Sequence, residues 1–154
     1  MFSNGPGDPS ENTEVIKNIR EIAQLGIPIF GICLGHQLMA LAHGATTQKL
    51  KYGHRGANQP VIDKALGKTF VTSQNHGYAV VGESMDPEIG EVSHINANDG
   101  TCEGMRYKNI NAFTVQFHPE AHGGPQDTAY LFDEFIAVSY THLRAHETLM
   151  NLVC

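Results

Sequence analysis

The 154-residue chain contains no tryptophan and only three cysteines, Cys33, Cys102 and Cys154. An odd number of cysteines, without Cys-x-x-Cys spacing, argues against a disulfide framework and against a structural zinc site. The sequence also lacks any apolar run near the roughly 18 residues that a membrane-spanning helix needs, and it does not open with a secretory signal. These absences lead us to expect a cytoplasmic protein that does not contact the membrane.

Positive charge is scarce as well, with 10 Lys and Arg residues against 16 Asp and Glu residues and a formal net charge of −6. Without a basic patch, the chain is not expected to bind nucleic acid. It also lacks the Gly-x-x-x-x-Gly-Lys-Ser/Thr loop that binds ATP phosphates. We therefore expect no cofactor in this chain.

Histidine, by contrast, is abundant, with nine residues that lie mostly far apart in the sequence. His118 and His122 are closer, but Pro119 between them prevents a helical His-x-x-x-His face. The spacing therefore predicts no metal site.

An apolar segment, residues 28–32, leads into the motif Gly-x-Cys-x-Gly at residues 31–35, and a helical pattern follows. This is the cysteine form of the nucleophile elbow, a sharp strand-to-helix turn known from Gly-x-Ser-x-Gly hydrolases. Side chains at Gly31 or Gly35 would clash with such a turn, and the helix N-terminus favours the reactive thiolate of Cys33. The motif alone leaves open a buried core cysteine followed by a glycine turn.

A second motif, His118-Pro119-Glu120, follows an apolar strand pattern at residues 113–117. A histidine at a strand end can reach a neighbouring elbow, and a carboxylate two residues later can orient its imidazole, which is the logic of a catalytic triad. Taken singly, His118 could be an ordinary surface histidine and Glu120 a solvated loop charge. An elbow cysteine and a His-x-Glu segment in one short chain favour catalysis instead.

These motifs resemble those of class I, triad-type glutamine amidotransferases, and more narrowly the glutaminase domain of carbamoyl-phosphate synthetase small subunits. Three further segments carry the resemblance: Ser-Asn-Gly-Pro-Gly-Asp-Pro at 3–9, His-Arg-Gly-Ala-Asn-Gln-Pro at 54–60 and Gln-Asn-His-Gly-Tyr at 74–78. The last two differ from the matching segments of GMP synthetase and anthranilate synthase subunits. The resemblance runs from about Phe2 to Ala137 and predicts a partial amidotransferase domain over residues 1–138.

The resemblance implies a role for each matching residue. Cys33 corresponds to the nucleophile, His118 to the general acid and base, and Glu120 to its orienting carboxylate. Gly7 and Leu34 would donate oxyanion-hole amides. The residues expected to bind glutamine are Gly5, Gly7, Leu34, Gln37, Asn75, Gly77 and Tyr78.

The fold expected from pattern and resemblance is α/β, with a mainly parallel central sheet, flanking helices and additional short antiparallel strands. The first helix should span residues 11–23, capped by Ser10 or Asn12 and closed by Gly26, and the elbow helix should run to Ala42. Short strands follow at 46–52, 59–62, 70–73, 78–81, 91–98 and 102–107, and a last helix at 128–138.

The chain departs from the family pattern at both ends. The resemblance implies at least two strands and a separate domain ahead of the Asn-Gly-Pro-Gly loop, so we expect an N-terminally truncated sheet with an exposed edge. Residues 139–154 match nothing expected of the family. They are predicted to be a non-native or disordered tail, with a lineage-specific extension as the alternative.

The resemblance implies that the chain hydrolyses L-glutamine through a cysteine thioester. The ammonia would pass to a synthetase large subunit, which holds the ATP and metal ions and makes carbamoyl phosphate for arginine and pyrimidine biosynthesis. Two alternatives stay open: an amidotransferase subunit of a different synthase, and an inactive fragment that keeps only the fold and a docking surface.

Overall fold

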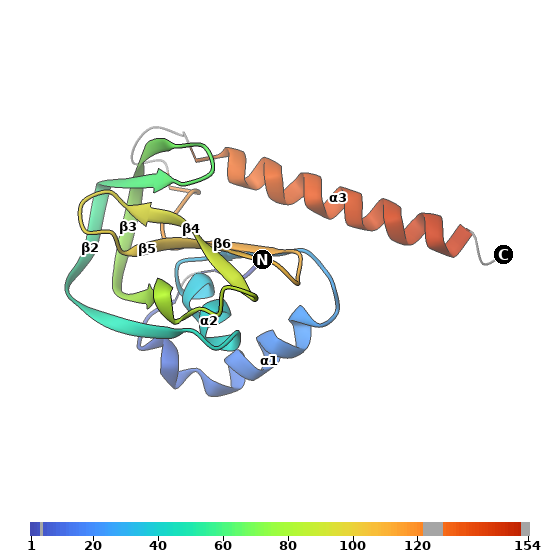
Figure 1. Cartoon of the computed structure of the whole chain (residues 1–154), viewed down its shortest axis with the longest axis horizontal. Helices are drawn as coiled ribbons and strands as arrows, with labels where there is room; N and C mark the ends of the chain where they lie inside the picture. Colours follow the sequence, from blue (N-terminus) through green and yellow to red (C-terminus); the bar gives the residue numbers. More distant parts are fainter. Residues whose placement is uncertain (4, 122–127, 152–154) are drawn as a thin grey trace.

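The computed structural model describes residues 1–3, 5–121 and 128–151, with side chains as far as Arg144. Within these ranges a six-stranded sheet is accompanied by three α-helices (Figure 1). The helices are α1 (Thr13–Ala23), α2 (Leu34–Ala42) and α3 (Tyr130–Asn151). The strands are β1 (Ile29–Ile32), β2 (Thr46–Asp63), β3 (Lys68–Val81), β4 (Gly90–Asn96), β5 (Cys102–Tyr107) and β6 (Ala112–Val115).

The sheet has a short parallel part and a larger antiparallel part. Strand β1 pairs with β6 in parallel, and Phe2 adds a parallel bridge to Gly31. Strands β2 to β5 pair antiparallel, and because β4 contacts both β2 and β5, these four strands close into a barrel-like ring. The predicted α/β class is confirmed, whereas the predicted mainly parallel arrangement is wrong for the described residues.

Short connections explain the antiparallel pairing. Parallel neighbours need a crossover of about a dozen residues or more, whereas antiparallel neighbours can be joined by a tight turn. The turns at residues 64–67, 97–101 and 108–111 join β2 to β3, β4 to β5 and β5 to β6. The predicted strands at 46–52 and 59–62 are both parts of β2, and those at 70–73 and 78–81 are both parts of β3.

The first helix starts later than predicted. A 3₁₀ turn, η1 (Pro9–Glu11), precedes it, and the Asp8 carboxylate caps that turn by accepting a hydrogen bond from the Ser10 amide at 2.9 Å. Asn12 occupies the N-cap position of α1, but its side chain makes no capping bond. Gly26 has a φ of 71°, as expected where a glycine ends a helix.

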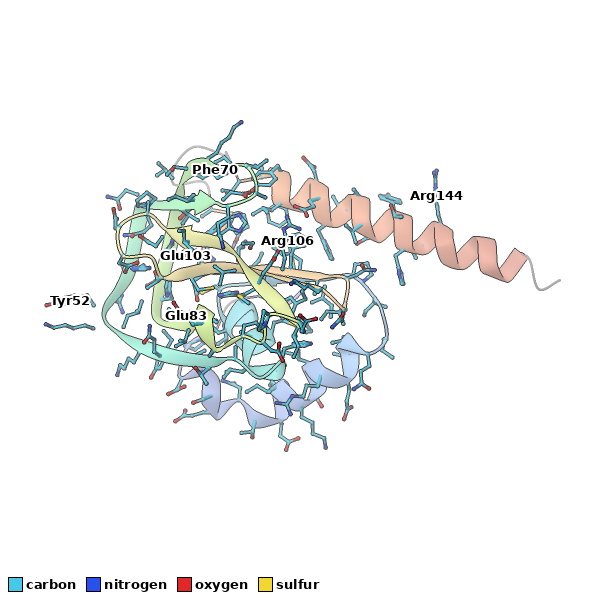
Figure 2. The ribbon with its side chains drawn as sticks, in the orientation of Figure 1. Tyr52, Phe70, Glu83, Glu103, Arg106 and Arg144 are labelled. Carbon is cyan, nitrogen blue, oxygen red and sulfur yellow. The ribbon has the colours of Figure 1, made fainter. Side chains whose placement is uncertain are left out.

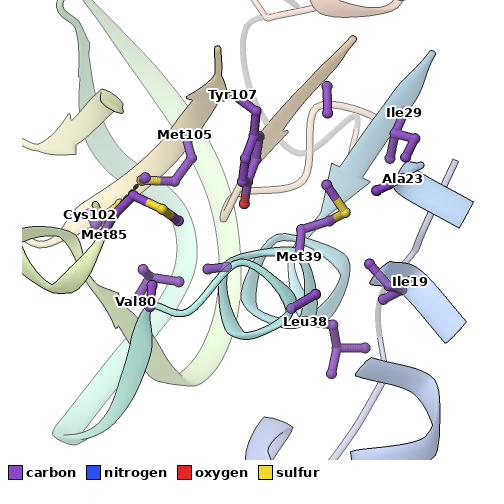
Figure 3. Packing of buried hydrophobic residues seen from close by; sticks show 14 residues of the cluster. Ile19, Ala23, Ile29, Leu38, Met39, Val80, Met85, Cys102, Met105 and Tyr107 are labelled. Carbon is purple, nitrogen blue, oxygen red and sulfur yellow. Dashed lines mark hydrogen bonds between the residues drawn. The ribbon is translucent and has the colours of Figure 1, made fainter. Parts of the chain in front are cut away.

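Alternation along β1 and β6 sends side chains into two cores, one on each face of the sheet. Ile29 and Ala112 face α1 and α2, where they join the cluster drawn in Figure 3 with Ile19, Met39 and Met105. The other face carries the second cluster, which packs against α3 and contains Phe30, Ile32, Phe113, Val115, Phe117 and Leu131. The elbow that follows β1 is therefore held between two packed layers.

The last helix runs through the predicted boundary at residue 138. It begins against the second core and then extends away from the sheet as far as Asn151 (Figure 1). A bidentate salt bridge ties its Glu134 to Arg106 of β5, with distances of 2.6 and 3.0 Å; Arg106 is labelled in Figure 2. Residues 139–151 belong to this helix in the structure, and they contain neither proline nor glycine, which would disfavour a helix. The prediction of a non-native or disordered tail at 139–154 is not tested by this. The non-native origin of this segment stays a prediction.

No helix in the described part of the chain is both long and apolar enough to cross a membrane.

We predict that Phe30→Ala destabilises the chain strongly. The Phe30 side chain is fully buried, and its ring centroid lies 4.6 Å from that of Phe113 and 5.8 Å from that of Phe135. Removing such a ring costs about 3–5 kcal/mol, measurable by urea unfolding. Tyr52→Ala is the matched control, because Tyr52 is 77% exposed (Figure 2). Equal losses in the two variants would show that the α3 side of the sheet is not a packed core.

Candidate active site

Cys33 sits at the turn between β1 and α2 with a φ of 53° and a ψ of −107°. It is the one non-glycine residue with a positive φ among those described, and such strain persists only where the surroundings enforce it. The Cys33 amide donates to the Val115 carbonyl at 2.9 Å. A Cβ built on Gly31 would lie 2.9 Å from the Gly35 carbonyl oxygen, and one on Gly35 would lie 2.5 Å from the Phe2 carbonyl oxygen. The two glycines are required by close backbone approach, as the motif predicts.

His118 and Glu120 lie beyond the end of β6. The His118 Nδ1 atom is 2.8 Å from Glu120 Oε1, and the His118 amide donates to the Ser73 carbonyl of β3 at 2.9 Å. Interaction with the Cys33 thiol, together with the bond to Glu120, outweighs partial burial and raises the pKa of His118 to about 9. The geometry thus brings cysteine, histidine and carboxylate into one chain of contacts, while their catalytic roles stay predictions.

A cavity of about 120 Å³ opens beside the cysteine, small compared with the several hundred Å³ of sites for drug-sized ligands. Every residue predicted to bind substrate lines it: Gly5, Gly7, Leu34, Gln37, Asn75, Gly77 and Tyr78. Pro6, His76 and Cys33 complete the lining. A larger hollow of about 560 Å³ near β4 contains none of the predicted residues. The predicted residues therefore gather around the small cavity, and their role in substrate binding stays a prediction.

The loop at residues 5–9 is shaped by two glycines for different reasons. A Cβ on Gly5 would lie 2.8 Å from Leu34 Cδ2, whereas one on Gly7 would meet no atom within 4 Å. Gly7 is instead required by its φ of 101°, which residues with side chains rarely adopt. Hydrogen bonds from Ser10, and a further one from Tyr78, hold the pKa of Asp8 below its ordinary value. The Asp8 contacts tie the loop to β3.

Leu34 is the first residue of α2, so its amide belongs to the first helical turn and has no acceptor within the helix. It adjoins Cys33 and lines the cavity. An amide in this place can stabilise an oxyanion.

Sequence reasoning assigned no role to Gln116. Its side chain is fully buried, and its Nε2 atom lies 3.7 Å from the Cys33 sulfur. A carboxamide between Val115 and Phe117, just ahead of the His-Pro-Glu motif, was the available signal.

A second group of titratable residues also escaped the sequence analysis. His54, His76 and Glu103 come from three strands, and potential ligand atoms on them lie within 4.8 Å of one another. Each ring nitrogen already has a partner: those of His54 contact Glu103 and Asp99, and those of His76 contact the Tyr78 carbonyl and the Gln74 side chain. Glu103, labelled in Figure 2, is fully buried. These hydrogen bonds are sufficient to explain why the three side chains lie together, without a bound ion. The expectation of no metal site stays a prediction.

Comparison with known proteins identifies the family. Residues 1–138 match the family model described as glutamine amidotransferase class-I. The chain belongs to this family.

Curated relatives narrow the similarity. The chain is 59% identical over 139 residues to the carbamoyl phosphate synthase small chain of Bacillus caldolyticus, covering 90% of this chain and 38% of the relative. It is 54% identical to the small chain of Symbiobacterium thermophilum, with the same two coverages. This amidotransferase chain therefore spans about two fifths of the length of these relatives.

Solved structures show the same fold. A putative GMP synthase subunit from Thermoplasma acidophilum superposes with a TM-score of 0.80 at 22% identity, covering 94% of this chain and 74% of the other. A glutamine amidotransferase from Thermotoga maritima gives a TM-score of 0.64 at 21% identity, covering 97% and 72%. At these identities the likeness concerns the fold alone.

We predict that iodoacetamide alkylates Cys33 much faster than Cys102 in a Cys154→Ser chain. Burial raises the pKa of the Cys102 thiol to about 12, so almost none of it is thiolate at neutral pH. Mass spectrometry of tryptic peptides after timed labelling measures both rates, and Cys33→Ser is the control. Faster labelling at Cys102 would remove Cys33 as the nucleophile.

We also predict that the His118 imidazole titrates near pH 9 in side-chain NMR spectra. The raised pKa stabilises the folded chain below the ordinary value of 6.5, and this contribution is lost as pH rises through 9. Cys33→Ser should lower the midpoint, since the thiol is the largest cause of the shift. His54, whose pKa Glu103 raises to about 9, should not respond to that substitution. A His118 midpoint near 6.5 in the parent chain would contradict the proposed contact with Cys33.

Proposed function

We propose that this chain hydrolyses the side-chain amide of L-glutamine, and that its ammonia serves a carbamoyl-phosphate synthetase large subunit. One observation carries the proposal: a strained elbow cysteine contacts His118, which Glu120 holds, beside a small cavity lined by glycine loops. The similarity to carbamoyl phosphate synthase small chains supports the choice of partner.

The proposed reaction has two balanced halves. The Cys33 thiolate attacks the amide carbon, and the amides of Gly7 and Leu34 stabilise the oxyanion. The His118 imidazolium gives its proton to the departing nitrogen, which leaves as ammonia, and a glutamyl thioester remains. Water then loses a proton to neutral His118 and attacks the thioester, so that glutamate leaves and the thiolate returns.

The state of His118 suits the first half of this reaction. A pKa near 9 keeps the imidazole protonated at neutral pH, where it balances a thiolate and holds the proton that the leaving group needs. The Glu120 carboxylate accepts a hydrogen bond from His118 Nδ1. This bond orients the ring so that its other nitrogen, Nε2, faces the reacting atoms. Glu120 therefore orients the ring without transferring a proton itself.

The cavity offers groups of the right kind for a free amino acid. Backbone amides and carbonyls on the loop of Gly5 and Gly7, and on the segment of Asn75, Gly77 and Tyr78, can approach an ammonium and a carboxylate closely. Such binding needs no cofactor in this chain. ATP and metal ions would act on the large subunit, in the cytoplasm, toward arginine and pyrimidine biosynthesis.

We predict that His118→Asn lowers glutamine-dependent synthesis by about 10²–10⁴-fold, the usual contribution of a proton-transfer group. The assay uses the longest protein that the gene encodes, combined with its large subunit, and follows glutamate release and carbamoyl phosphate. Synthesis from free ammonia should survive, because it bypasses this site. His43→Asn is the matched control, since the His43 ring bonds the Met39 carbonyl far from the elbow along α2.

Each alternative function gives a different result in this assay. Glutamate release without carbamoyl phosphate, with any large subunit tested, would point to a different synthase. No glutamate release from the parent protein would indicate an inactive fragment. Normal turnover in His118→Asn would exclude the proposed triad.

A further inference from the structure

Gln116 connects the nucleophile to the predicted substrate site through its two polar atoms. Its Nε2 atom donates to the Cys33 sulfur at 3.7 Å, within the range of hydrogen bonds to sulfur. Its Oε1 atom accepts a hydrogen bond from Gln37 Nε2 at 2.9 Å. One buried carboxamide thus contacts both the reacting atom and a side chain that lines the cavity.

The second contact determines what Gln37 can present to a ligand. Gln37 Nε2 has two hydrogens, and its two acceptors are Gln116 Oε1 at 2.9 Å and the Tyr78 carbonyl at 2.8 Å. With both donors used, the carboxamide oxygen is the group that Gln37 can offer to the cavity. An acceptor in that place suits the ammonium group of an amino acid.

The backbone gives Gln116 little freedom to rearrange. Its amide donates to the Glu103 carbonyl of β5 at 2.8 Å, and the preceding carbonyl, of Val115, accepts from the Cys33 amide at 2.9 Å. The side chain is fully buried. A polar side chain held on both sides in this way keeps one orientation, which is the property required of a group that sets the geometry of others.

We propose that Gln116 is a positioning residue for Cys33 and Gln37. Its N–H fixes the direction of the sulfur and stabilises the thiolate, because a hydrogen bond to the charged form favours that form. Its oxygen keeps the Gln37 acceptor turned to the cavity. The consequence for turnover rests on the proposed function, whereas the effect on the sulfur can be measured without any substrate.

The test follows the pH dependence of Cys33 alkylation by iodoacetamide in the 154-residue chain carrying Cys154→Ser. Gln116→Glu keeps an acceptor for Gln37 but places a carboxylate beside the sulfur. The midpoint should therefore rise by at least about one pH unit, which corresponds to alkylation about ten-fold slower below the midpoint. Gln116→Met removes the donor without adding charge and should give a smaller rise in the same direction.

The control is Ser93→Ala, which removes a buried polar group that contacts His94 and does not line the cavity. It should leave the alkylation midpoint unchanged. Circular dichroism establishes which variants are folded. If the buried carboxylate prevents Gln116→Glu from folding, the alkylation midpoint of Gln116→Met alone tests the proposal. The proposal would be overturned if the pH midpoint of Cys33 alkylation in a folded Gln116 variant lay within about 0.3 unit of the parent value. A shift of that size corresponds to about a two-fold change in alkylation rate.

A kinetic arm separates this proposal from the proposed function. In a protein that hydrolyses glutamine, Gln116→Met should raise KM and lower kcat, because it disturbs both Gln37 and the sulfur. Gln116→Glu should act mainly on kcat. If the parent hydrolyses no glutamine but its alkylation midpoint still shifts in the variants, the proposed function fails and the positioning of Cys33 by Gln116 stands.

Discussion

The close approach of three backbone segments around Cys33 is the constraint on which the site depends. The chain at Phe2, strand β1 and the first turn of α2 meet where neither Gly31 nor Gly35 can carry a Cβ. Strand β6 completes the arrangement by accepting the Cys33 amide, and two hydrophobic layers press on β1 from opposite faces. The strained conformation of the cysteine persists because the close backbone contacts and the two packed cores hold the turn in place, while the cavity leaves one side of Cys33 open.

The antiparallel ring of β2 to β5 supplies the other half of the site. Ser73 of β3 anchors the His118 backbone, and the same strand brings Asn75, Gly77 and Tyr78 to the cavity. The same strand carries His76, which lies close to His54 and Glu103. Burial raises the pKa of the Glu103 carboxyl, and the bond to that carboxylate raises the pKa of His54. This polar group couples the ring to the site, since His76 also binds the Tyr78 carbonyl.

Local motifs made the elbow, the His-Pro-Glu segment and the lining of the cavity predictable, because each depends on residues close in sequence or on a family pattern. The antiparallel ring was not predictable in the same way. Its register joins Val80 to Cys102 and His54 to His76, and no local period encodes such pairings. The role of Gln116 could not be predicted for a related reason. It depends on the contact with the Cys33 sulfur, which only the folded structure brings about.

The junction of Phe2 with β1 has a dynamic consequence. The Phe2 amide donates to the Phe30 carbonyl at 2.8 Å, and the Ile32 amide donates to the Phe2 carbonyl at 2.9 Å. These two bonds pair Phe2 with β1, and the glycine loop follows a few residues later. Hydrogen exchange at these two amides therefore measures how often the loop detaches from the elbow, on a timescale separate from global unfolding.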